Sequence, residues 1–94
     1  MTEAKVRIPT PLRSFTGGAD EVVCAGADVR AVLAALATRF EGIGERILDD
    51  SGELRPFVNV FVGARDVRTL EGLGTPLADG AVLSILPAVA GGRP

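Results

Sequence analysis

The chain has 94 residues, of which 47% are hydrophobic and 23% charged, and its formal net charge at pH 7 is −2. This is the composition of one globular domain, and it offers neither the basic surface nor the aromatic stacking platform of a nucleic-acid-binding protein. Because histidine is absent, Ser-His and Cys-His nucleophile pairs and histidine metal sites are excluded. We therefore expect that the chain is not an enzyme.

The sequence also carries features that bear on the cellular compartment. No basic stretch followed by an apolar core marks a secretory signal at the start, and no apolar run approaches the ~20 residues of a membrane helix. The only cysteine, Cys24, cannot form a disulfide within the chain, which favours a reducing compartment. We expect a cytoplasmic protein in which Cys24 is a small buried hydrophobic residue rather than a reactive thiol.

The first half of the chain predicts a hairpin followed by a helix. Residues 4–8 alternate between apolar and charged side chains as a half-buried strand does, before two prolines end or bend it. Turn residues at 16–20 lead into a second strand at 21–25. Asp28 is a good helix N-cap and Gly42 a plausible stop. The helix would have one apolar stripe at positions 29, 32, 33, 36, 37 and 40, and residues 43–48 would add a helical turn.

The second half predicts further strands. Residues 57–62, FVNVFV, form the clearest one, with the three valines facing the helix and Phe57, Asn59 and Phe61 facing away. A turn at 63–66 leads to a short strand at 67–70, and an Asp79-Gly80 hairpin signal precedes the last strand at 81–87. Since one helix covers only one face of a sheet, we predict an α+β fold with four to five strands and one uncovered face.

The uncovered face is the first candidate site. Phe57 and Phe61 would lie there with Leu86 of the last strand, and an exposed apolar patch on a small soluble domain usually binds a partner. The alternative is that loops or the N-terminal segment cover these three residues. We favour a partner-binding patch.

The end of the sequence is the second candidate site. After the last strand, residues 88–92 read AVAGG and contain no side chain larger than valine. Extended, five residues reach roughly 17 Å, which suits a tail that threads a narrow channel and presents a carboxylate to another protein. The alternative is an ordinary frayed terminus. We divide the chain into a domain at 1–88 and a flexible tail at 89–94.

These segments together resemble a known family. FVNVFV at 57–62, TPLADG at 75–80 and LPAVAGG at 86–92 are similar to the MoaD/ThiS family of ubiquitin-like sulfur carriers, and IPTPLR, RPFVN and ILPAVAGG to its CysO-type branch. The resemblance spans nearly the whole chain. It implies a β-grasp fold, a mixed sheet with one main helix on one face.

The resemblance also implies a reaction cycle. An E1-like enzyme of the MoeB/ThiF type uses ATP to adenylate the carboxylate of Gly92, and a sulfur donor then converts the adenylate to a thiocarboxylate. A synthase takes the sulfur for cysteine, a thiosugar or another sulfur-containing metabolite or cofactor. Val89, Ala90, Gly91 and Gly92 would form the tail that enters these partners. No cofactor would be bound to the carrier itself.

The sequence departs from the family pattern after Gly92. Arg93 and Pro94 follow it, so the Gly92 carbonyl lies in a peptide bond and no carboxylate is available. Either the two residues are removed, as a JAMM-type metalloprotease does for some carriers of this family, or the carrier function has been lost. We favour a processed precursor. Two other functions stay open: a ubiquitin-like modifier joined to lysines of target proteins, and an inert β-grasp interaction module.

Overall fold

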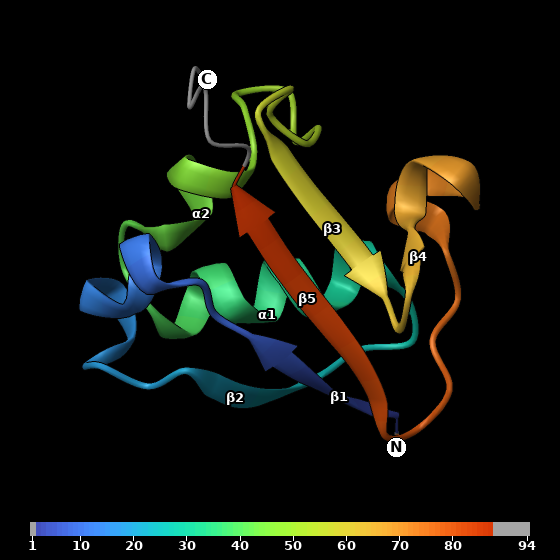
Figure 1. Ribbon diagram of the computed structural model, residues 1–94, viewed down its shortest axis with the longest axis horizontal. Helices are drawn as coiled ribbons and strands as arrows, with labels where there is room; N and C mark the ends of the chain where they lie inside the picture. Colours follow the sequence, from blue (N-terminus) through green and yellow to red (C-terminus); the bar gives the residue numbers. More distant parts are fainter. Residues whose placement is uncertain (1, 88–94) are drawn as a thin grey trace.

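The computed structural model describes the backbone of residues 2–87 and the side chains of residues 2–86. Five strands form one mixed sheet in the order β2-β1-β5-β3-β4 (Figure 1). β1 and β5 run parallel, and the other neighbouring pairs are antiparallel. The strands are β1 (Glu3–Arg7), β2 (Glu21–Ala25), β3 (Val58–Val62), β4 (Arg65–Asp66) and β5 (Ala81–Pro87). The predicted α+β, β-grasp architecture is confirmed.

The main helix, α1 (Val29–Arg39), begins where the sequence predicts. The Asp28 carboxylate accepts a hydrogen bond from the Ala31 backbone N–H at 2.8 Å, the usual bond of a helix N-cap. α1 ends at Arg39, before the predicted stop at Gly42. Gly42 has a positive φ of 91° and is instead the N-cap residue of α2 (Ile43–Ile47). Three short 3-10 helices complete the elements: η1 (Thr10–Thr16), η2 (Val67–Thr69) and η3 (Gly72–Gly74).

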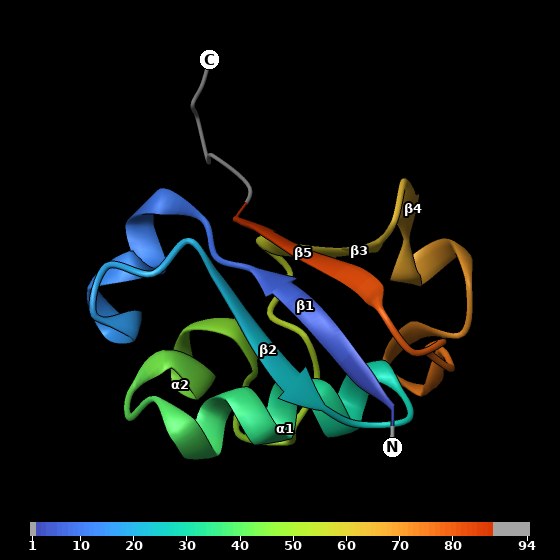
Figure 2. The same cartoon turned by 90° about the horizontal axis from the view of Figure 1, so that it is seen from below.

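The core lies between α1 and one face of the sheet. Figure 2 shows α1 running beneath the strands as a separate layer. Alternate strand residues point toward this layer, as the period-2 pattern requires, and are almost fully buried: Val6, Val58, Val60, Leu83 and Ile85. The buried residues that α1 contributes to the same core are Val29, Val32, Leu33 and Leu36. Among the described residues no element covers the opposite face, which we call the outer face.

Two predicted elements in the second half differ from the structure. The short strand is Arg65–Asp66 rather than residues 67–70, because the Asp66 carboxylate accepts a hydrogen bond from the Arg68 N–H at 2.9 Å and starts η2 there. The Asp79-Gly80 turn does not close a hairpin. Asp79 accepts from the Glu3 N–H at 2.9 Å and Gly80 donates to the Glu3 carbonyl at 2.8 Å. The turn therefore aligns β5 beside β1.

Candidate functional site: the outer face of the sheet

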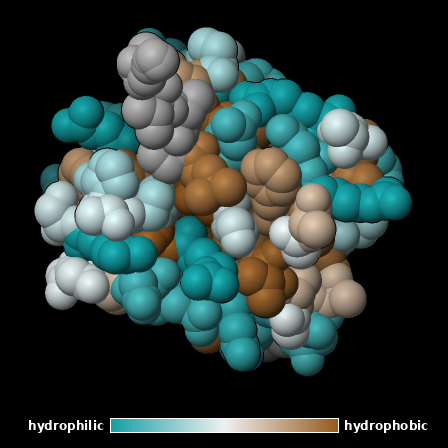
Figure 3. Space-filling view, in the orientation of Figure 1, coloured by the Kyte–Doolittle hydropathy of each residue, from teal (hydrophilic) through white to brown (hydrophobic). Residues whose placement is uncertain are grey.

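Two of the three predicted patch residues lie together on the outer face. Phe61 of β3 is opposite Ser84 of β5, and Asn59 is opposite Leu86, so Phe61 and Leu86 are diagonal neighbours on one side of the pair. Leu86 is 48% exposed, whereas Phe61 is half-buried. Figure 3 looks onto this face, where apolar surface runs down the middle between polar side chains on both sides. The outer face thus has an apolar centre that solvent reaches.

Phe57 does not belong to that patch, and the prediction that placed it there was wrong. The Val58 N–H donates to the Arg55 carbonyl at 3.0 Å, which makes residues 55–58 a turn, so the strand alternation starts only at Val58. Phe57 is 49% exposed. It lines a separate groove of about 350 Å³ with η1 residues and Arg46 of α2. Phe57 therefore belongs to a different exposed apolar site from Phe61 and Leu86.

Arginines lie close to Phe61 and Leu86, and they were not predicted from the sequence. Arg7 lies opposite Ser84 on β1, and Arg68 donates to the side chain of Asn59 at 2.8 Å. No local sequence pattern identifies this group, because strand pairing and η2 bring its members together. Alternation on β1 does place Arg7 outward, which is the one signal available in advance.

Cys24 occupies the position that the sequence analysis gave it. Its side chain is 3% exposed and belongs to the core. Burial raises the pKa of the thiol, and the Arg39 guanidinium, 3.9 Å from the sulfur, opposes that rise only in part. A buried thiol with a raised pKa is protonated near neutral pH and is a poor nucleophile. The structure supports a packing role.

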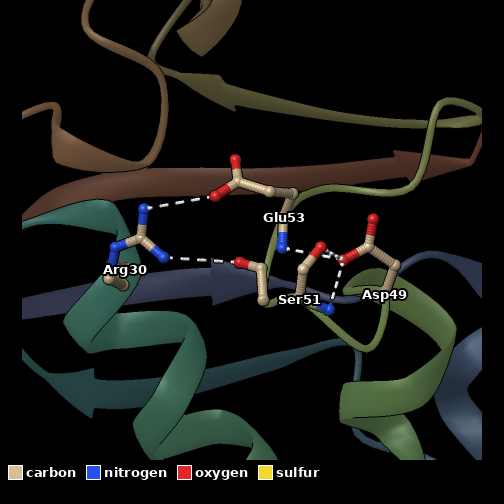
Figure 4. Close-up of polar contacts among 5 residues, drawn as sticks. Arg30, Asp49, Ser51 and Glu53 are labelled. Atoms are coloured by element: carbon tan, nitrogen blue, oxygen red, sulfur yellow. Dashed lines mark hydrogen bonds and ion pairs between the residues drawn. The ribbon is translucent and has the colours of Figure 1, made fainter.

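The acidic loop before β3 is held by its own hydrogen bonds. Asp49 accepts three of them, from the backbone and hydroxyl groups of Ser51 and from the Glu53 N–H, at 2.8–3.1 Å (Figure 4). These bonds favour the charged carboxylate and lower its pKa. Arg30 of α1 contacts the same loop, 3.9 Å from Glu53. Within residues 2–87, no group of three Cys, Asp or Glu side chains is placed to hold a metal ion.

The second candidate site falls outside the described residues. This holds for the predicted tail, Val89, Ala90, Gly91 and Gly92, and for Arg93 and Pro94. The structure does show where that segment begins, because Pro87 closes β5 opposite Val58 of β3. None of the helices in the described part of the chain has the length and apolar character needed to cross a membrane.

Comparison with known proteins agrees with this architecture. The sulfur carrier protein CysO of Mycobacterium tuberculosis is 48% identical over 89 residues, which cover 93% of this chain and 96% of that protein. Small archaeal modifier protein 3 of Haloferax volcanii is 42% identical over 66 residues, covering 70% and 71%. The crystal structure of the Amycolatopsis orientalis BexX/CysO complex contains a chain that matches with a TM-score of 0.88 and 42% identity, covering 94% of this chain and 98% of that one.

Residues 6–92 match the ThiS family. The matched segment includes the end of β1, every later described strand and helix, and the Gly91-Gly92 pair of the predicted tail. Sulfur carriers of this kind are protein co-substrates and not catalysts, in agreement with the expectation that the chain is not an enzyme. This chain belongs to the ThiS family of ubiquitin-like β-grasp proteins.

Proposed function

We propose that this protein is a sulfur carrier whose Gly92 is converted to a thiocarboxylate. The observation that carries the proposal is the ThiS family match, which runs through the fold and ends at Gly92. The 48% identity to a sulfur carrier protein over nearly the whole chain supports the same function. The sulfur would enter a biosynthetic product such as cysteine, a thiosugar or another sulfur-containing metabolite or cofactor.

The chemistry requires a free carboxylate at Gly92. Water first hydrolyses the Gly92–Arg93 peptide bond and releases the residues that follow. A carboxylate oxygen then attacks the α-phosphorus of ATP, which gives an acyl-adenylate and pyrophosphate. Hydrosulfide then attacks the acyl carbon and expels AMP, which leaves the thiocarboxylate. Glycine at 91 and 92 leaves no Cβ to obstruct the approach of the enzyme groups that perform these steps.

Three partners follow from this cycle. An E1-like enzyme of the MoeB/ThiF type binds ATP and performs the adenylation, so the carrier needs no cofactor of its own. A JAMM-type metalloprotease removes Arg93 and Pro94, and a synthase accepts the sulfur. The solved BexX/CysO complex supports docking of a carrier of this fold onto another protein. On this chain we assign docking to the outer face at Phe61 and Leu86.

Two purified forms test the proposal, one ending at Pro94 and one at Gly92. Each is incubated with the E1-like enzyme of the same organism, ATP and a sulfide source. We expect pyrophosphate release and a thiocarboxylate, detected by whole-protein mass as the exchange of one oxygen for sulfur, only from the form ending at Gly92. Equal turnover of the longer form with Arg93 and Pro94 still attached would contradict the processing step. No turnover of either form would contradict the carrier function.

One observation favours a second candidate function. The similarity to small archaeal modifier protein 3 suggests a ubiquitin-like modifier. The same acyl-adenylate would then be attacked by the amine of a target lysine, which forms an isopeptide bond and releases AMP. High-mass adducts in the native cell would identify the modifier, and a thiocarboxylate on the free protein would identify the carrier. An unmodified protein under every growth condition would instead indicate an inert interaction module.

A further inference from the structure

Three arginines gather at the end of the outer face where β5 finishes, which we call the tail-side end. Arg7, the last residue of β1, lies there because β1 runs parallel to β5. It lines a shallow groove of about 250 Å³ between β1 and β5, together with Arg13 of η1, Ser84 and Leu86. Arg68 approaches the same end from the other side, through Asn59, the strand partner of Leu86. The arginines therefore flank Leu86 on both sides.

Hydrogen bonds to neutral groups position two of these arginines without neutralising them. The Arg13 Nε donates to the Ile8 carbonyl at 3.0 Å. Arg68 uses both Nη atoms, which donate at 2.8 Å to the Asn59 side-chain oxygen and to the Val58 carbonyl. Each guanidinium keeps a full positive charge while its side chain is held in place.

The acidic side chains near this end form no ion pair with its arginines within the described residues. The only ion pair between described side chains, Arg30 with Glu53 at 3.9 Å, lies on the α1 side of the sheet. Glu21, which faces Arg7 across the β1–β2 pair, forms none with it. Asp66, opposite Phe61 on β4, accepts a hydrogen bond from the Arg68 backbone N–H and likewise forms no ion pair with a described arginine. The end of the sheet where β5 finishes thus carries three arginines that no described ion pair neutralises, in a chain whose net charge is −2.

We propose that the tail-side end of the outer face recognises an acidic segment of the activating enzyme. Carboxylates on that segment pair with Arg7, Arg13 and Arg68 around an apolar centre that contacts Phe61 and Leu86. Apolar centres with charged rims are common in transient protein interfaces, and rim charges mainly set the association rate and the choice of partner. The inference rests on the proposed function, because it names the chemistry of the enzyme that adenylates Gly92.

The experiment compares variants with a matched charge change. Arg7 is the best position because its side chain forms no hydrogen bond or ion pair with another described residue, and Arg30→Gln on α1 removes the same charge from the other layer. Binding of the form ending at Gly92 to the E1-like enzyme of the same organism is measured from low to high NaCl concentration. We expect Arg7→Gln to weaken binding about fivefold at low salt, the upper range for an exposed pair. The loss should lie mainly in the association rate and disappear at high salt.

Arg7→Glu should weaken binding further, and Arg30→Gln should match the unmodified protein at every salt concentration. Phe61→Ala is measured alongside, because it tests docking on the outer face without changing its charge. Loss of binding in Phe61→Ala with no effect of either Arg7 variant would overturn the acidic-segment proposal and leave the docking face intact. An equal effect of the Arg7 and Arg30 variants would also overturn it, since the effect would then follow net charge. Failure of the proposed function would appear separately, as absence of thiocarboxylate at saturating enzyme.

Discussion

Gly26, which directly follows β2, has no space for a side chain where the chain passes α1. A Cβ at this position would lie 2.7 Å from the Val32 nitrogen, 2.8 Å from the Val32 Cγ2 atom and 2.9 Å from the Ala31 carbonyl carbon. Two of these three atoms belong to the helix backbone, whose first turn is fixed by the Asp28 cap. Gly26→Ala can therefore be accommodated only if the helix and the strand move apart.

The cost follows from forcing one methyl group into a packed core. Such substitutions cost about 1–3 kcal/mol, and we expect about 2 kcal/mol of unfolding free energy for Gly26→Ala. In a domain of this size, that lowers the Tm by about 8–16 °C. Because the chain has no Trp or Tyr, unfolding by heat and by urea is best followed by far-ultraviolet circular dichroism.

Gly74→Ala is the matched control. A Cβ at Gly74 would meet nothing within 4 Å, and neither Gly74 nor Gly26 has a positive φ. The two substitutions thus change the unfolded chain in the same way and differ in the space available in the folded protein. Gly74→Ala should change the stability by no more than about 0.5 kcal/mol. If Gly26→Ala were as stable as Gly74→Ala, the close approach of β2 to α1 would not constrain the fold and our reasoning would be wrong.

Three further predictions concern other parts of the molecule. Asp28→Ala removes the hydrogen bond to the Ala31 N–H and should cost about 1 kcal/mol, measured by urea unfolding, with Asp28→Asn retaining most of it. Because the pKa of Asp49 is lowered, the hydrogen bonds that its carboxylate accepts should all be present above pH 3.8, the ordinary pKa of the group. They should be lost only as the pH falls through the lower pKa that the carboxyl has in the folded protein. Amide exchange at Ser51 measured against pH checks this, and loss already at pH 5 would contradict it. Cys24→Ala should cost about 1 kcal/mol and leave sulfur loading unchanged. Loss of loading with the fold intact would make the thiol a participant.

The parts of the fold that could be predicted are those set by neighbours in the sequence. The stripe on α1 and the alternation of Val58 and Val60 on β3 depend on the period of a helix or a strand, and both are visible in the residue pattern. The Gly91-Gly92 pair is also visible in the sequence, but it lies outside the described residues, so the tail stays a prediction. The buried place of Cys24 likewise followed from its position within an apolar strand.

The parts that could not be predicted depend on contacts between distant segments. Phe57 continues the alternation of β3 in the sequence, but the turn at Arg55 takes it out of the strand. Arg7 and Arg68 are far apart in the chain, and they reach one end of the sheet only because β1 pairs with β5 and η2 packs beside β3. No local period records such a pairing. The apolar centre of the outer face was therefore visible in advance, whereas its basic end was not.

The central position of β5 has a consequence for how the protein is made. β5 lies between β1 and β3, so it joins the N-terminal hairpin to the rest of the sheet. Among the five described strands it is also the last to be synthesised. Until it emerges from the ribosome, the earlier strands form two separate pairs that cannot close one core, and pairing of Ala4 with Ala81 requires nearly the whole chain. Shortened translation products that lack β5 should therefore stay unfolded and be degraded, so that only chains already synthesised to the start of the tail become folded protein.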